Sequence, residues 1–110
     1  MEKPRIAVVD DKDYVRETVA QILEYTGYSA TSLDPNAALA TRKAFDLLIT
    51  DCDMKPVTTG PEVYEAMRKH NSSLKVIYMS GGLNTDNLKP FIAKPLEKLV
   101  DLVEQILKSK

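Results

Sequence analysis

Short apolar runs alternate with amphipathic stretches along the whole chain. One continuous run, residues 47–49, lies between Asp46 and Asp51 and shows no alternation of apolar with polar positions. Such a run is typical of a strand that is buried on both faces of a parallel sheet. The pattern predicts strands at residues 5–9, 28–33, 47–49, 74–79 and 91–93. The polarity of 28–33 indicates an edge strand or a strand with one exposed face.

The stretches between these strands carry helix signals. Asp13 is expected to cap a helix that stops at Gly27, because apolar residues recur there at helical spacing. Asp34 followed by Pro35 predicts a second helix, through Ala44. Two further helices are expected, one opened by Gly60-Pro61 and ending near His70 and Asn71, and one with an apolar stripe over residues 96–107.

This order of elements predicts the fold class. Five alternations of strand and helix favour an α/β protein with a doubly wound five-stranded parallel sheet of order 2-1-3-4-5, that is, a flavodoxin-like fold. The fourth helix is expected to be shortened, since residues 83–90 are polar and allow about two turns at most. We expect residues 1–110 to form a single domain, because this length supports one core.

Composition narrows the possible function classes. A net charge of −1 disfavours direct nucleic acid binding through a broad basic surface. No apolar run approaches the roughly 20 residues of a membrane span, and the N-terminus lacks a signal peptide core. The single cysteine, Cys52, permits no internal disulfide and fits a reducing compartment, so we expect a cytoplasmic location. With one histidine and one thiol, a zinc site is not expected.

Polar residues follow four of the predicted strands. Asp10 and Asp11 end the first, Asp51 the third, Ser80 the fourth and Lys94 the fifth. The carboxyl ends of parallel strands share one edge, so the three acids are expected to converge if the first and third strands are neighbours. Because like charges disfavour one another, a hard divalent cation is expected between them, and Mg²⁺ suits oxygen ligands and phosphate best.

Each of these residues also has a simpler interpretation. Taken alone, Asp51 is more typical of a residue that opens a turn, and the other strand ends are what favour a functional role. Asp10 and Asp11 are compatible with a helix cap, Ser80 with a turn before two glycines, and Lys94 with a solvated charge.

Taken together, the motifs resemble the receiver domain of two-component response regulators over essentially the whole chain. The resemblance implies that Asp51 accepts a phosphoryl group from a phosphohistidine on a histidine kinase or a phosphotransfer protein. It also implies a Mg²⁺ site formed by Asp10, Asp11, Asp51 and the backbone carbonyl of Asp53. The residues that carry it are Asp10-Asp11, Asp51, Met54, Pro56, Gly60, Ser80 and the run 91–95, FIAKP.

The resemblance also covers the residues that would respond to phosphorylation. It implies that Ser80 and Lys94 contact the phosphoryl group, that Phe91 is the aromatic switch, and that Lys94-Pro95 is a cis peptide. An aromatic residue that starts a strand is as often core as switch. The implied protein is a bacterial phosphoprotein that catalyses only its own phosphorylation and slow dephosphorylation. Its output partner and oligomeric state stay open. No output domain is expected after residue 110, so the chain is expected either to act alone by docking to partners or to be a piece of a hybrid kinase or regulator.

Two departures from the family pattern are visible. Lys55 adds a residue between Met54 and Pro56, and the span from Ser80 to Lys94 is short for a full helix. The short span motivates an alternative function, a receiver-like scaffold that binds partners without phosphorylation. A small metal-dependent phosphatase is a further alternative, because Asp53 follows Asp51 by two positions, but the chain has no room for the cap such an enzyme needs.

Overall fold

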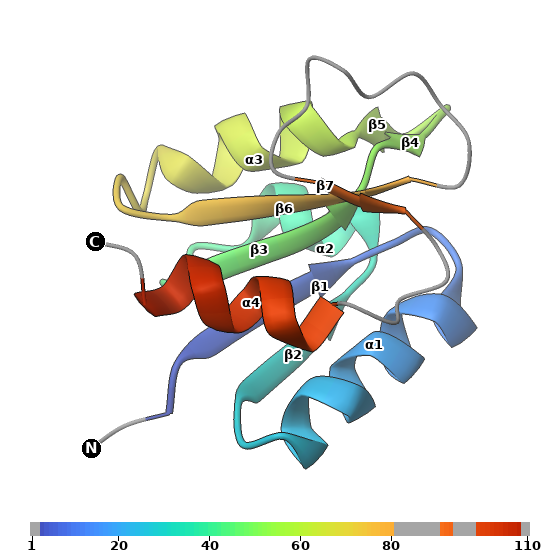
Figure 1. The fold of residues 1–110 in the computed structure, drawn as a ribbon. Coiled ribbons are helices and arrows are strands. Elements are labelled where there is room, and N and C mark those ends of the chain that lie inside the picture. The colour runs from blue at the N-terminus through green and yellow to red at the C-terminus, as the bar shows by residue number, and fades with distance from the viewer. Residues whose placement is uncertain (1–2, 81–90, 94–98, 109–110) are drawn as a thin grey trace.

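The computed structural model describes residues 3–80, 91–93 and 99–108. Its centre is a five-stranded parallel sheet with helices on both faces (Figure 1). The strand order, β2-β1-β3-β6-β7, is the predicted order 2-1-3-4-5 of the five parallel strands, so the fold class is confirmed. These strands are β1 (Arg5–Val9), β2 (Ser29–Leu33), β3 (Leu47–Asp51), β6 (Lys75–Ser80) and β7 (Phe91–Ala93).

Two hydrophobic clusters lie on the two faces of the sheet. Alternate side chains of β1 divide between them, with Ile6 and Val8 in one cluster and Ala7 and Val9 in the other. The first face is covered by α1 (Asp13–Tyr25) and α4 (Leu99–Lys108), and the second by α2 (Pro35–Ala40) and α3 (Gly60–Arg68) (Figure 1). The inner strands are uniformly apolar in sequence because helices pack on both faces of the sheet.

The central strand β3 is the most protected part of the sheet. Leu47, Leu48 and Ile49 are fully buried, as expected for a strand that pairs with β1 on one side and β6 on the other. The edge strand β2 contrasts with it, because all five of its residues are partly exposed. The predicted difference between a central and an edge strand is therefore confirmed.

Truncation of this strand should show how much stability its burial supplies. We expect Ile49→Ala to lower the free energy of unfolding by about 2–5 kcal/mol, because it removes buried methyl groups and leaves a cavity. Urea denaturation followed by circular dichroism measures this loss. The control is Leu39→Ala, since Leu39 is 39% exposed and should cost less than about 1 kcal/mol. Equal losses for the two variants would contradict the placement of Ile49 in the core.

Three predicted helix boundaries need correction. Helix α1 begins at Asp13, and its cap residue is Lys12, which makes no side-chain capping bond. Helix α2 ends at Ala40 instead of Ala44, because Thr41 is extended and its hydroxyl accepts the Lys43 N–H at 3.2 Å. This local bond replaces the continuation of the helix. Helix α3 ends at Arg68, slightly earlier than predicted.

The other ends lie close to their predicted positions. Asp34 caps α2 by accepting the Ala37 N–H, with Pro35 as the first helical residue. Gly27 follows α1 with a positive φ of 106°, which suits the expected stop. Strand β2 starts one residue later than predicted, and β6 is shifted by one residue toward Ser80.

A small antiparallel hairpin follows the central strand, where the sequence predicts only a loop. Its strands are β4 (Asp53–Met54) and β5 (Thr58–Thr59), and the Val57 N–H donates to the Met54 carbonyl across the turn. The Lys55-Pro56 peptide within the turn is cis. The hairpin is anchored from inside, because Met54 is 1% exposed and packs in the cluster beneath α3.

Two expectations lie outside the described residues. The shortened fourth helix falls within residues 81–90, and the Lys94-Pro95 peptide falls within residues 94–98. In the described ranges, none of the helices combines the length and the apolar character needed to cross a bilayer.

Candidate functional site

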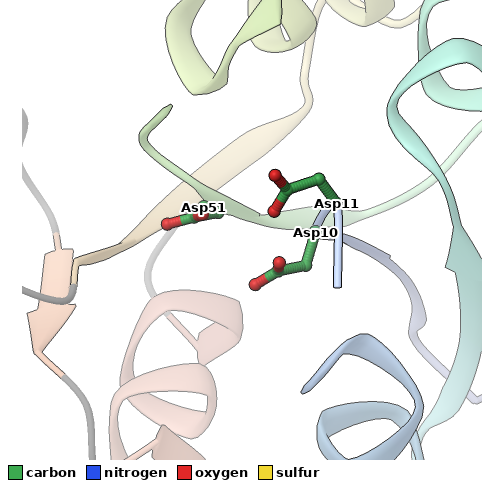
Figure 2. Close-up of side chains that lie close together, drawn as sticks. All are labelled: Asp10, Asp11 and Asp51. Atoms are coloured by element: carbon green, nitrogen blue, oxygen red, sulfur yellow. The ribbon is translucent and has the colours of Figure 1, made fainter. Parts of the chain in front are cut away.

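Three carboxylates meet at the carboxyl edge of the sheet, as predicted. Asp10 and Asp11 directly follow β1, and Asp51 is the last residue of its neighbour β3. One carboxylate oxygen from each residue lies within 4.8 Å of the others. Figure 2 shows the three side chains projecting into the same region beyond the strand ends. The pairing of β1 with β3 brings together residues that are 40 positions apart in the sequence.

The two acids after β1 differ in their environment. Asp10 is fully buried, and its Oδ1 accepts the Lys12 N–H at 2.9 Å. That bond holds the turn between β1 and α1 and orients the carboxylate. Asp11 is exposed, so its side chain can adjust to a ligand. The pair therefore combines a fixed oxygen ligand with an adaptable one.

The backbone next to Asp51 helps to orient its carboxylate. Its Oδ1 accepts the N–H of Cys52 at 3.0 Å, and its main-chain carbonyl accepts the Thr50 hydroxyl at 3.0 Å. Thr50 is fully buried, whereas Asp51 is half-buried at the end of the strand. The acceptor candidate thus sits at the boundary between core and solvent, where a reactant can reach an oriented carboxylate.

Arg16 is a member of this region that sequence reasoning missed. Its side chain is 13% exposed, and Nη1 donates to the Asp10 carbonyl at 3.2 Å and pairs with Asp13 at 2.6 Å. Nε is buried without a hydrogen-bond partner. Helical spacing is the sequence feature that could have placed Arg16 in this region. Arg16 precedes the buried Val19 and Leu23 by three and seven residues and so shares their helix face. It places a fixed positive charge behind the acids.

The residues present fit a hard divalent cation. Mg²⁺ takes oxygen ligands, commonly one or two carboxylates completed by waters and phosphate oxygens. Asp10, Asp11 and Asp51 each offer a carboxylate oxygen within 4.8 Å of the others, and the exposed Asp11 can adjust its position. Three neighbouring carboxylates also repel one another as anions, which favours a bound cation.

Asp53 does not join the carboxylate cluster. It is exposed on β4, and its Oδ1 accepts the Lys55 N–H at 3.0 Å within the hairpin turn. The contribution expected from Asp53 is its backbone carbonyl, and that ligand stays a prediction.

The other predicted residues are placed only in part. Ser80 ends β6, one position beyond Met79, which pairs with Asp51. Phe91 begins β7 opposite Tyr78. The side chains of Ser80 and Phe91, and the whole of Lys94, lie outside the described residues. The backbone thus brings Ser80 to the same edge as the acids, and the roles of all three residues stay predictions.

Burial also affects a tyrosine in the cluster that α2 and α3 cover. Tyr78 on β6 is 6% exposed, and burial raises the pKa of its hydroxyl above the ordinary value of 10.0, with smaller contributions from Tyr64, Cys52 and Glu65. Tyr78 therefore stays protonated at neutral pH.

Comparison with known proteins gives the same family from sequence and from structure. The family model described as the response regulator receiver domain matches residues 6–106. A similar protein is the response regulator receiver protein CpdR of Brucella abortus (strain 2308), with 33% identity over 114 residues that cover 94% of each chain.

Solved structures extend the likeness to three dimensions. The CheY-like response regulator receiver domain protein of Methanospirillum hungatei JF-1 has a TM-score of 0.84 and 25% identity, over 97% of this chain and 95% of that one. The response regulator receiver protein of Pseudomonas putida has a TM-score of 0.77 and 28% identity, over 96% of this chain and 98% of that one. In each case nearly the whole of both chains is matched.

Proposed function

This chain belongs to the response regulator receiver domain family of two-component signalling, and we propose that it is a switch phosphorylated on Asp51 with the help of Mg²⁺. The observation that carries the proposal is the meeting of Asp10, Asp11 and Asp51 at the end of adjacent strands. The donor proposed is a phosphohistidine on a histidine kinase or phosphotransfer protein, which is the donor that the family uses.

Asp51 serves as the nucleophile in this proposal. One carboxylate oxygen attacks the phosphorus atom, the bond from phosphorus to the donor nitrogen breaks, and the donor imidazole leaves with that electron pair. The product is an acyl phosphate on Asp51, which water later cleaves to restore the carboxylate. The Cys52 N–H, which donates to Oδ1 of Asp51, keeps the carboxylate in a fixed direction during the attack.

Charge balance decides whether a phosphoryl group can approach these acids. A bound Mg²⁺ would be held by Asp10, Asp11, Asp51 and the Asp53 carbonyl, and would supply the positive charge that phosphoryl transfer requires. Arg16 orients the first of these ligands through its bond to the Asp10 carbonyl. We assign to Lys94 a second positive charge on the phosphoryl oxygens.

The response to phosphorylation is proposed to begin at the end of β6. The Ser80 hydroxyl donates to a phosphoryl oxygen, and Phe91 then turns into the space that the serine backbone vacates. Support for this placement is the register, in which β6 pairs with β3 on one side and β7 on the other. The changed surface would bind an output protein, whose identity the chain does not specify.

Incubation with acetyl phosphate tests the proposed function. We expect intact-mass analysis to show one phosphoryl adduct with Mg²⁺ present and none with an excess of chelator. Absence of an adduct under conditions where Mg²⁺ binds would contradict the proposal and favour a scaffold that works without phosphorylation.

Asp53 is expected to influence how long the phosphoryl group persists. It lies two residues from the acceptor, is exposed, and is oriented by the Lys55 N–H. We expect Asp53→Asn to change the dephosphorylation rate by about twofold or more, because a charge near the acyl phosphate alters the approach of water. The rate is followed by the decay of the phosphorylated mass after donor removal. Equal rates for the two proteins would refute this role.

A further inference from the structure

Gly60, the first residue of α3, packs against the main chain of the acceptor residue. A Cβ atom at this position would lie 2.5 Å from the Asp51 carbonyl oxygen and 3.3 Å from the Cys52 Cα. Real Cβ atoms essentially never come within 3.0 Å of another heavy atom, so only glycine fits here without a shift. The nearest atom belongs to the backbone, which cannot rotate away as a side chain can.

A hydrogen bond holds the two segments in this contact. The Gly60 N–H donates to the Cys52 carbonyl at 2.9 Å, so the first turn of α3 is fixed to the chain just after Asp51. The same Cys52 residue donates its own N–H to Oδ1 of Asp51 at 3.0 Å. The peptide that orients the acceptor carboxylate is therefore the one that Gly60 contacts.

The first turn of α3 is itself firmly placed. Thr59 and Glu62 form a capping box, and the Thr58 hydroxyl donates to the Glu62 carboxylate at 3.1 Å. Val63 and Met67 are buried beneath the helix. Because these contacts resist movement of α3, a side chain at position 60 has to displace the Asp51 peptide instead.

From these contacts we infer that Gly60 is a positioning residue for phosphoryl transfer. Because Gly60 has no side chain, α3 packs closely against the Asp51–Cys52 peptide and fixes its position. The fixed peptide in turn orients the Asp51 carboxylate toward Asp10 and Asp11. This role rests on the proposed phosphorylation of Asp51, and it adds α3 to the parts of the fold that determine the rate.

The substitution Gly60→Ala tests the inference. To restore a 3.0 Å contact, the backbone has to move by about 0.5 Å. A displacement of about 1 Å can lower a rate by about 100-fold, so half of that displacement is expected to cost about tenfold. We therefore expect phosphorylation by acetyl phosphate to slow by about tenfold or more at saturating Mg²⁺.

A second glycine provides a matched control. Gly27 has φ +106° but no atom within 4 Å of a Cβ built there, and it follows the end of α1 that lies away from Asp10. Gly27→Ala is expected to lower the melting temperature through backbone strain, with a wild-type rate of phosphorylation. The pair separates lost stability from lost positioning, because both variants add the same methyl group.

A spectroscopic readout makes the test independent of phosphorylation. In an amide NMR spectrum, Gly60→Ala should displace the Cys52 resonance, and Gly27→Ala should leave it in place. If Gly60→Ala does not fold, Thr59→Val takes its place, because it removes the cap of the same turn and should slow phosphorylation several-fold. Wild-type rates and an unmoved Cys52 resonance in the Gly60 or Thr59 variant would overturn the inference. A wild-type protein that takes no phosphoryl group would instead overturn the proposed function, and the NMR comparison would still decide whether Gly60 sets the acceptor peptide.

Discussion

Asp51→Asn should abolish the Mg²⁺-dependent phosphoryl adduct. The amide that replaces the carboxylate has nearly the same shape and can still accept the Cys52 N–H, but it is not a nucleophile toward phosphorus. In metal-free buffer we also expect the variant to be more stable than the wild type by roughly 1 kcal/mol, because one of several neighbouring like charges is removed. Intact-mass analysis and thermal denaturation measure the two effects.

The control for this variant lies at the other end of the same strand. Asp46 immediately precedes β3, and its carboxylate accepts the Arg5 N–H at 2.8 Å. Asp46→Asn makes the same chemical change and the same change in net charge, far from the acids after β1, so we expect an unchanged adduct. A phosphoryl adduct that persists in Asp51→Asn would show that the acceptor is another residue.

Asp11→Asn should weaken Mg²⁺ binding by about 10- to 100-fold. Asp11 is exposed at the edge of the site, so its substitution removes a charged ligand without disturbing the core. At a concentration of Mg²⁺ that is about 100 times the dissociation constant, the wild type gains roughly 2.7 kcal/mol of stability. The variant should lose about half of that gain if binding weakens about tenfold and most of it if binding weakens about 100-fold. Thermal denaturation with and without Mg²⁺ measures this loss.

Asp13→Asn is the matched control for the metal measurement. Asp13 lies two residues further along and pairs with Arg16, but it is not a member of the carboxylate cluster. We expect its variant to bind Mg²⁺ within about twofold of the wild type, since its charge is exposed and screened. Similar losses in the Asp11 and Asp13 variants would mean that the effect is general electrostatic attraction and not ligation.

The sheet was predictable because burial leaves a strong mark on sequence. A strand covered on both faces has to be apolar throughout, as Leu47, Leu48 and Ile49 are, and the edge strand β2 has to be more polar. Helix ends were less predictable. Helix α2 stops where the Thr41 hydroxyl accepts the Lys43 N–H, and the spacing of apolar residues does not reveal such a side-chain bond to the backbone. The β4–β5 hairpin was missed because two-residue strands carry no periodicity.

The acidic part of the site was predictable for a topological reason. Acids that end parallel strands must share one edge, so Asp10, Asp11 and Asp51 meet once β1 and β3 are neighbours. Arg16 was not found, and Gly60 was recognised only as a helix start and a residue of the family motif, because the contacts of both residues run between separate elements. The Arg16 guanidinium donates to the Asp10 carbonyl, and a Cβ atom at Gly60 would meet the Asp51 carbonyl oxygen. Neither contact has a signature in local sequence.

The most direct test of the central claim locates the phosphoryl group on the chain. After reaction with acetyl phosphate and Mg²⁺, reduction with borohydride converts an acyl phosphate on aspartate into homoserine, and peptide mass analysis identifies the residue. We predict homoserine at position 51 and at no other acid, with none formed when Mg²⁺ is chelated. Homoserine at Asp10, Asp11 or Asp53, or its absence from a protein that binds Mg²⁺, would contradict Asp51 as the phosphoacceptor.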